Sequence, residues 1–284
     1  MKKALLCAVA LIITLGTVSP AFAGSVYVVI VDPRGSGGST QATELWLSNS
    51  GTAQTAVKGF FVEAFADGTK RSGNPAQITV APGRSFLLGN AGVVGKHGLL
   101  EIDASGNIAV EARLTSTSAN GTSATFTQVP VISSANLIPA GETAFLNGLQ
   151  RTAAQGNITG LGIVNLGKAR AQCSVKAFRS DGAQLGPTAG LSFEPLSLQH
   201  YADAFLALGA ERVVDGRATV TCDQPFYAFA TLFVGRTAQM LFVTPAQTGA
   251  STLTVPGQAP PPGPPSESGA IVVREDGLLH VPTR

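Results

Sequence analysis

The chain has 284 residues, only 13% of them are charged, and its formal net charge is +2. Proteins that bind nucleic acid or anionic lipid present clustered lysine and arginine side chains, and the sequence contains no such cluster. These properties argue against nucleic acid or an anionic membrane as a main partner, and the length allows two domains of ordinary size.

Residues 1–23 have the pattern of a secretory signal peptide. Two lysines precede a mostly apolar run, and Ala21-Phe22-Ala23 is a small-x-small cleavage signal. The apolar run is shorter than the roughly 20 residues that a bilayer span needs, so we expect no stable membrane span. We predict an exported bacterial protein whose mature chain begins at Gly24, located in the periplasm, on the cell surface or outside the cell.

The mature sequence is typical of an all-β protein. Short runs of alternating apolar and polar residues are separated by Gly, Pro, Asn or Asp, and the chain contains 33 glycines. The one segment with a helical pattern is 200–209, which we expect to be a short crossover between sheets. The stretch 103–107 is expected to be a turn.

A series of segments occurs twice, in the same order and at a nearly constant offset, which predicts a tandem duplication. The matching pairs are 45–51 with 161–167, 62–68 with 175–182, 78–85 with 191–198, 98–112 with 216–230, and 125–131 with 240–246. Each copy has about seven strand candidates, and hairpin turns are expected at 66–68 and 180–182, where glycine accepts a positive φ. This spacing favours two β-sandwich domains, 24–135 and 136–247.

On the "VNLG", "FRSDG" and "FEP" positions, residues 25–247 resemble tandem immunoglobulin-like or fibronectin-like β-sandwich modules of secreted bacterial proteins. The resemblance implies a module without catalytic activity that has an adhesive, structural or binding role.

Cys173 and Cys222 are the two cysteines of the mature chain, and each shares a strand face with small apolar residues. In the alignment of the two copies they fall opposite Phe60 and Ala104, a large and small apolar pair that indicates contact across the core. Because exported proteins form disulfides, we predict one disulfide between them. Two separately buried thiols are the alternative.

Trp46 is the only tryptophan of the chain. Its neighbours Leu45 and Leu47 align with apolar residues of the second copy, so alternation directs Trp46 away from the core, as it does Phe61 and Phe65. Aromatic side chains on an outer sheet face form a candidate patch for contact with a partner. The alternatives are that the two domains pack at this patch or that a loop covers it.

The sequence contains no recognisable catalytic, nucleotide-binding or metal-binding motif. His97, His200 and His280 are far apart in the chain, and we expect His200 and Asp203 to be a solvated pair on the short helix. We therefore expect no enzyme activity, no cofactor and no metal.

The chain ends in a Pro/Gly-rich linker, 248–268, followed by a strand or hairpin tail, 269–284. Two apolar runs flank Asp276-Gly277, which is a hairpin signal. An isolated hairpin is only marginally stable, so the tail requires a sheet edge or an apolar groove. It would dock on its own sandwich, add a strand to another molecule through Ile271, Val273, Leu279 and Val281, or stay disordered until processed.

We thus predict a secreted structural or adhesive protein that acts through sheet edges and exposed aromatics, with protein partners bound by strand addition. Self-assembly through the tail is one of the three modes left open above. One alternative is a periplasmic binding or chaperone-like module for an exported partner. Another is an extracellular hydrolase or an accessory module of one.

Overall fold

The structure is a computed structural model that describes residues 22–30, 40–70, 75–88, 96–117, 121, 124–234, 239–246, 272–273 and 279–280. Residues 1–21 of the expected signal peptide and the whole expected linker lie outside the described residues. Phe22 and Ala23 begin the first strand.

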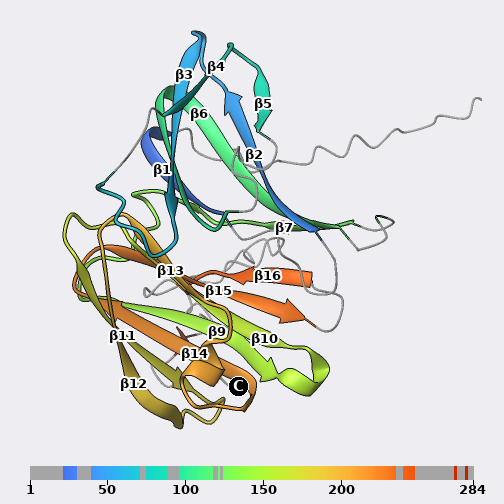
Figure 1. Cartoon of the computed structure of the whole chain (residues 1–284), viewed down its shortest axis with the longest axis vertical. Helices are drawn as coiled ribbons and strands as arrows, with labels where there is room; N and C mark the ends of the chain where they lie inside the picture. The colour runs from blue at the N-terminus through green and yellow to red at the C-terminus, as the bar shows by residue number, and fades with distance from the viewer. Residues whose placement is uncertain are drawn as a thin grey trace, which may run out of the picture.

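The described residues form an all-β protein, as the sequence predicts (Figure 1). The N-terminal sandwich consists of β1 Phe22–Ile30, β2 Thr40–Asn49, β3 Thr55–Glu63, β4 Ala76–Val80, β5 Ser85–Leu88, β6 Gly98–Thr117, β7 Ala124–Gln128 and β8 Val131–Ile132. The C-terminal sandwich consists of β9 Thr143–Thr152, β10 Ile158–Asn165, β11 Ala171–Phe178, β12 Gln184–Phe193, β13 Ser197–Tyr201, α1 Ala204–Ala207, β14 Arg212–Cys222, β15 Phe226–Val234 and β16 Gln239–Val243, with a 3-10 turn at Ala153–Gln155.

The two sandwiches have the same order of strand pairing. In the C-terminal one, the sheets are β12-β11-β14-β9 and β13-β10-β15-β16. In the N-terminal one, β3 and β1 pair with the first part of β6, while β2 and β7 pair with its second part, and β4 and β5 take the corresponding edges. The matching order is what a tandem duplication requires, although the duplication itself stays a prediction.

The strand β6 corrects the expectation of a turn at 103–107. It runs unbroken through this stretch and belongs to both halves of the N-terminal sandwich. In the C-terminal sandwich the chain breaks at the corresponding point, between β14 and β15. Around this stretch β6 pairs with β1 and β3 up to Ala104, and it pairs with β2 from Ile108 onward, so the strand continues while it changes partners.

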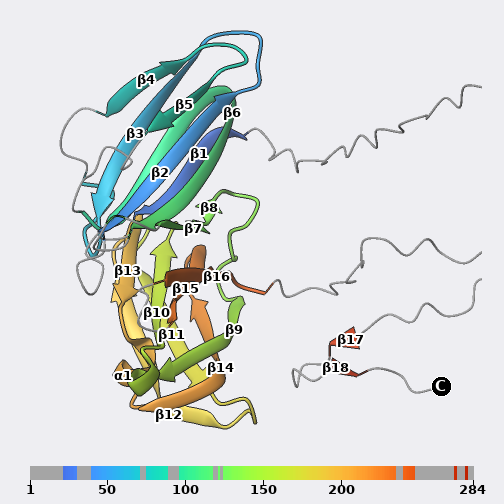
Figure 2. The same cartoon turned by 90° about the vertical axis from the view of Figure 1, so that its right-hand side faces the viewer.

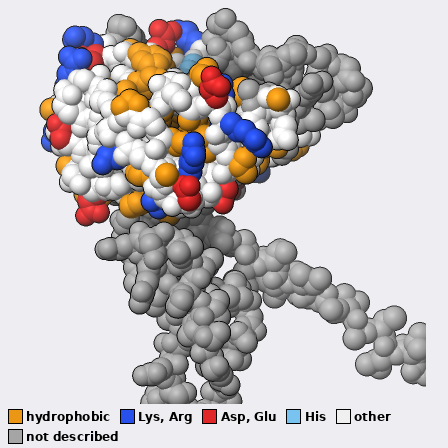
Figure 3. Space-filling view, turned by 90° about the horizontal axis from the view of Figure 1, so that it is seen from below, with side chains coloured by type: hydrophobic (Ala, Val, Ile, Leu, Met, Phe, Trp, Pro, Cys, Tyr) orange, Lys and Arg blue, Asp and Glu red, His pale blue; other side chains and the backbone are white. Residues whose placement is uncertain are grey.

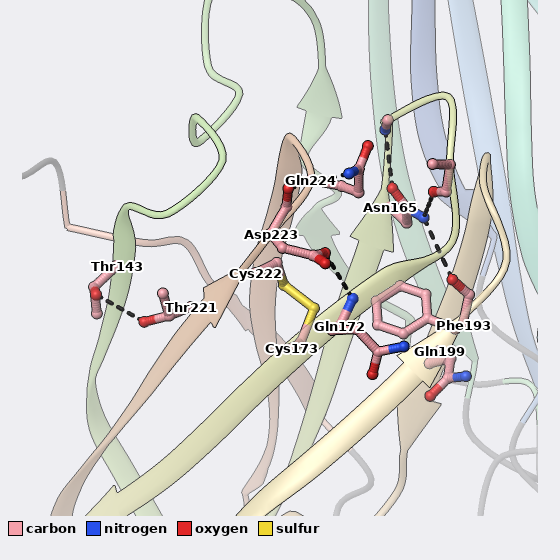
Figure 4. Close-up of a disulfide and its surroundings, with 12 residues drawn as sticks. Thr143, Asn165, Gln172, Cys173, Phe193, Gln199, Thr221, Cys222, Asp223 and Gln224 are labelled. Carbon is pink, nitrogen blue, oxygen red and sulfur yellow. Dashed lines mark hydrogen bonds between the residues drawn. A yellow bond between two sulfur atoms is a disulfide. The ribbon is translucent and has the colours of Figure 1, made fainter.

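A buried asparagine at the end of β2 and another at the end of β10 make the same set of hydrogen bonds. Asn49 donates to the carbonyl oxygens of Ala53 (2.8 Å) and Val80 (2.9 Å), and its own side-chain oxygen accepts from Gly51 N (2.9 Å). Asn165 donates to the carbonyl oxygens of residues 169 (2.9 Å), 194 (3.0 Å) and 193 (3.4 Å) and accepts from the amide of residue 167 (2.9 Å). Figure 4 shows its side chain and the bond to Phe193. These bonds pin each turn to a neighbouring strand end, which explains why an Asn-x-Gly pattern occurs in both copies.

Alternation along the strands builds a core in each sandwich. In β2, Leu45 and Leu47 are 1% exposed, while Trp46 between them is half-buried. Burying one such leucine contributes about 1.5–3 kcal/mol. The core of the C-terminal sandwich is drawn from both of its sheets and includes Ile163 and Phe226 of one sheet and Val175 and Val220 of the other.

The two sandwiches pack against one another. The sheet β13-β10-β15-β16 lies directly beneath the N-terminal sandwich (Figures 1 and 2). The face of this sheet that points away from its own core joins the N-terminal core cluster, through Val164, Leu198, Tyr227, Phe229 and Met240. The expected boundary at 135/136 falls in the connection between β8 and β9.

The sequence predicts hairpin turns at 66–68 and 180–182, and only the second is one. Segment 66–68 is not a tight hairpin turn: Phe65 N donates to Leu198 O (2.8 Å) and Gly68 N to Pro195 O (3.1 Å), so the connection reaches the other sandwich. A Cβ at Gly68 would lie 2.1 Å from the oxygen of Leu196, so this close approach requires glycine. Segment 180–182 is the expected turn, with Gly182 at φ 85°.

The helical expectation for 200–209 is correct only for Ala204–Ala207, because His200 and Tyr201 belong to β13. Asp203 caps this short helix and binds Arg151 at 3.0 Å. It is therefore not the partner of His200.

The tail contains the expected hairpin. β17, Val272–Val273, pairs antiparallel with β18, Leu279–His280, and together they form a two-stranded sheet of their own. Figure 2 shows this pair beside the C-terminal sandwich. In the part of the chain that the structure describes, no helix has the length and apolar character needed to cross a membrane.

Candidate contact surfaces

The predicted cysteine pair forms a disulfide between neighbouring strands of one sheet (Figure 4). Cys173 in β11 is the direct antiparallel partner of Cys222 in β14, with Cα atoms 4.1 Å apart. The expected contact across the core is therefore wrong. In the N-terminal sandwich the residue paired with Ala104 is Val57, while Phe60 pairs with Glu101, so the aligned Phe60 is shifted by three residues from the true counterpart of Cys173.

The interface between the sandwiches brings two histidines together that are far apart in sequence. The rings of His97 and His200 meet edge to face, with centroids 5.0 Å apart, and His200 stacks on Phe229 at 6.1 Å. Nε2 of His200 lies 3.1 Å from the hydroxyl of Thr231. Residue spacing alone carried no signal for this cluster, because its members come from different sandwiches.

His200 is held in its neutral form. Burial disfavours the charged imidazolium, and repulsion from His97 adds to this, so the pKa of His200 falls to about 3. The His200–Thr231 pair has the residue types of a base and a nucleophile. However, Thr231 is 0% exposed, so a substrate has no access to its hydroxyl, and a base of such low pKa is weak at neutral pH.

Trp46 lies on the outer face of the sheet formed by β5, β2, the second part of β6, and β7. The guanidinium of Arg113 lies between two rings, 5.5 Å from the centroid of Trp46 and 5.0 Å from that of Phe126. Nε of Arg113 donates to Glu44 at 2.7 Å. Phe126 is 58% exposed and Leu87, the cross-strand partner of Trp46, is 43% exposed. We call Trp46, Leu87, Glu44, Arg113 and Phe126 the Trp46 surface.

The Trp46 surface corresponds, strand for strand, to the buried face of the other sandwich. Trp46 pairs with Leu87 and Glu111, and at the same place in the C-terminal sandwich Gly162 pairs with His200 and Phe229. By the same comparison of pairing, Phe126 corresponds to Met240, which is only 2% exposed because it lies against the N-terminal sandwich.

The other two predicted contact aromatics are elsewhere. Phe61, in β3, is half-buried against the N-terminal core, with the ammonium of Lys96 5.8 Å from its ring. Phe65 has φ 66°, is 57% exposed, and meets Tyr201 edge to face at the boundary of the sandwiches. The three predicted aromatics therefore do not form one patch. Sequence reasoning missed Arg113 and Phe126. The alternation of β6 could have indicated Arg113, because its neighbours Ala112 and Leu114 are buried, whereas β7 contains no buried residue to mark Phe126.

A cavity of about 450 Å³ lies beside the connection 135–139, where Tyr227, Glu142 and residues 244–246 also line it. Burial raises the pKa of Tyr227 to about 12, which keeps the phenol protonated near neutral pH. The cavity therefore offers hydrogen bonding and not a phenolate nucleophile.

In the tail, Val273 pairs with Leu279. The predicted anchors Ile271 and Val281 lie outside the described residues.

Comparison of the chain with family models, with curated proteins and with solved structures found no match.

Proposed function

We propose that the protein is a secreted structural or adhesive protein without enzyme activity, and that the Trp46 surface is its contact site for another protein. The observation that carries the proposal is the Arg113 guanidinium held between two partly exposed rings. This surface corresponds to the face that the C-terminal sandwich uses to bind the N-terminal one. The fold thus already uses the corresponding face for a contact between its two sandwiches.

The chemistry of the Trp46 surface fits such a role. Tryptophan and arginine dominate the energetics of protein interfaces, because they combine a large apolar area with directed polar groups. Glu44 and the two rings hold Arg113 in place before a partner binds, which lowers the entropy that binding costs. The half-buried Glu44–Arg113 pair adds little stability to the monomer, about 0–1 kcal/mol, so we attribute its value to recognition.

Site-specific photocrosslinking tests the proposal. A benzophenone amino acid replaces Leu87 in the full chain, with Lys168, an exposed residue between β10 and β11, as the matched control. After irradiation of producing cells, we expect protein adducts from position 87 that disappear when Trp46→Ala and Arg113→Ala are added. Equal adducts from both positions, or adducts that survive the substitutions, would refute a contact at this surface.

The predicted export is part of the proposal, and the disulfide between Cys173 and Cys222 supports it, because disulfides persist in oxidising compartments. Sequencing of the purified protein's N-terminus checks it. A start at Gly24 is expected, and an intact Met1 in the mature fraction would contradict export through the predicted leader.

Strand addition by the tail is a second candidate mode of contact. The observation that favours it is the β17–β18 pair, which forms a sheet of its own and is not part of the larger sheets. Light scattering coupled to size exclusion, over a concentration series, would compare residues 24–284 with a version that ends at Thr248. Assembly of only the longer chain would assign the contact to the tail, and identical behaviour would remove this mode.

A further inference from the structure

We infer that the occupant of the Trp46 surface is a second copy of this chain, docked through the far end of its C-terminal sandwich. The inference rests on the proposed function and names the partner. It follows from the contact between the two sandwiches of one chain, in which one end of the N-terminal sandwich packs on the outer sheet face of the C-terminal one. The C-terminal sandwich has a corresponding exposed end, and the N-terminal sandwich has a corresponding exposed face.

The donor side of the existing contact is one end of the N-terminal sandwich. Phe65, which follows β3, and His97, which precedes β6, lie at this end. Phe65 N donates to Leu198 O, and the ring of His97 meets that of His200. The strand β7 adds a hydrogen bond from the Thr127 hydroxyl to Met240 O at 2.6 Å. Loop ends of one sandwich thus rest on the outer sheet face of the next.

The C-terminal sandwich presents the same end to solvent. His97 precedes Gly98, which pairs with the end of β3, and Asp215 precedes Gly216 at the corresponding position in β14. Two exposed apolar side chains mark this end: Val214 is 57% exposed, and Leu206 in the β13–β14 connection is 51% exposed. Figure 3 views the molecule from this end and shows hydrophobic side chains at the surface among separate charged ones.

The acceptor side is the Trp46 surface. Leu87 occupies the place of His200, and Phe126 occupies the place of Met240. Polar groups on the two surfaces also complement each other. Glu111 is exposed beside Trp46 on the acceptor, and Arg212 is exposed near Val214 on the donor. An apolar centre with one opposite-charge pair at its rim is the usual anatomy of a protein interface.

The contact joins two different surfaces of the same chain. Such a head-to-tail contact leaves one free donor and one free acceptor on every assembly, so it propagates into a filament unless the rotation closes a ring. The junction between copies would repeat the junction within the chain. This arrangement makes a row of equivalent sandwiches.

Cysteine crosslinking tests the inference on the full mature chain. The variant Leu87→Cys/Val214→Cys is treated with a short bismaleimide, since Cys173 and Cys222 are already paired. We expect a ladder of dimers, trimers and larger species. Each single variant should stay monomeric under the same conditions, because it carries only half of the junction. The matched control is Leu87→Cys/Lys168→Cys, which should give no ladder.

A second variant, Leu206→Glu/Val214→Glu, changes only exposed side chains, so its melting temperature should equal that of the wild type. We expect it to associate at least tenfold more weakly by light scattering, and the quenching of Trp46 fluorescence by acrylamide should no longer fall with concentration. A dimer from Leu87→Cys alone would show that the surface meets itself, which overturns the head-to-tail contact.

Two other results would overturn the inference without touching the proposed function. One is a wild-type chain that stays monomeric at every concentration while photocrosslinking from position 87 still yields a different protein. The other is association that depends on the residues after Thr248 and not on Leu206 and Val214, which would make the tail the occupant. Absence of both the ladder and the photocrosslinks would refute the proposed function as well.

Discussion

Acidification should weaken the junction between the two sandwiches through His200. The pKa of this imidazole is about 3 in the folded protein, because of burial and of repulsion from His97, whereas a histidine in the unfolded chain titrates near 6.5. Below about pH 6.5 the unfolded chain therefore binds a proton that the folded protein does not bind. As the pH is lowered from about 6.5, the free energy of unfolding should decrease, and it should continue to decrease until the pH reaches about 3.

The size of the effect follows from these two values. Between pH 8 and pH 5, linkage gives a loss of about 2 kcal/mol. This figure is an upper value, because a small part of the His200 side chain still reaches solvent and Thr231 can bind either form of the ring. For a chain of this size, it corresponds to a fall in melting temperature of about 4–8 °C.

Urea unfolding followed by far-UV circular dichroism at pH 8, 6.5 and 5 measures this change. The variant His200→Gln keeps an amide opposite the Thr231 hydroxyl and removes the titrating group, so its stability should vary less over the range by about 2 kcal/mol. A wild-type protein with the same pH dependence as His200→Gln would refute the reasoning.

Three further changes test the packing of the C-terminal sandwich. Gly162→Ala places a Cβ 2.0 Å from the ring of Phe229, so it should lower the free energy of unfolding by about 1–3 kcal/mol. Gly190→Ala, in open space on β12, should leave it unchanged. Thermal denaturation measures both, and equal effects would argue against the observed register. Replacing Cys173 and Cys222 by alanine removes a disulfide that links residues 49 positions apart in the sequence. The free energy of unfolding in urea should fall by about 4 kcal/mol. A change below about 1 kcal/mol would show that the disulfide does not constrain the unfolded chain. Asn165→Ala removes the hydrogen-bond partner of four backbone groups around a side chain that is 0% exposed. It should lower the free energy of unfolding by about 2–4 kcal/mol in calorimetry, and an unchanged value would contradict the turn-pinning role.

Local patterns in the sequence determined a large part of this protein. Strand alternation has a period of two, so the burial of Leu45 and Leu47 follows from their spacing alone. The aligned segments 45–51 and 161–167 each end in an asparagine and a glycine that form a buried hydrogen-bond network, although the sequence alone did not indicate these bonds. The position of the two cysteines on core faces of their strands was enough to predict that they pair.

Only the tertiary structure decided the register between strands and the neighbours across the junction. The alignment of the two copies matched Phe60 to Cys173, whereas the backbone pairing selects Val57, three residues earlier. A shift by an odd number of residues exchanges the two faces of a strand, so the register had to come from the pairing itself. The cluster of His97 with His200 and the enclosure of Arg113 between two rings join residues from distant segments. Periodicity specifies which way a side chain faces, whereas long-range backbone pairing specifies what it meets, and the candidate contact surfaces of this protein depend on the second.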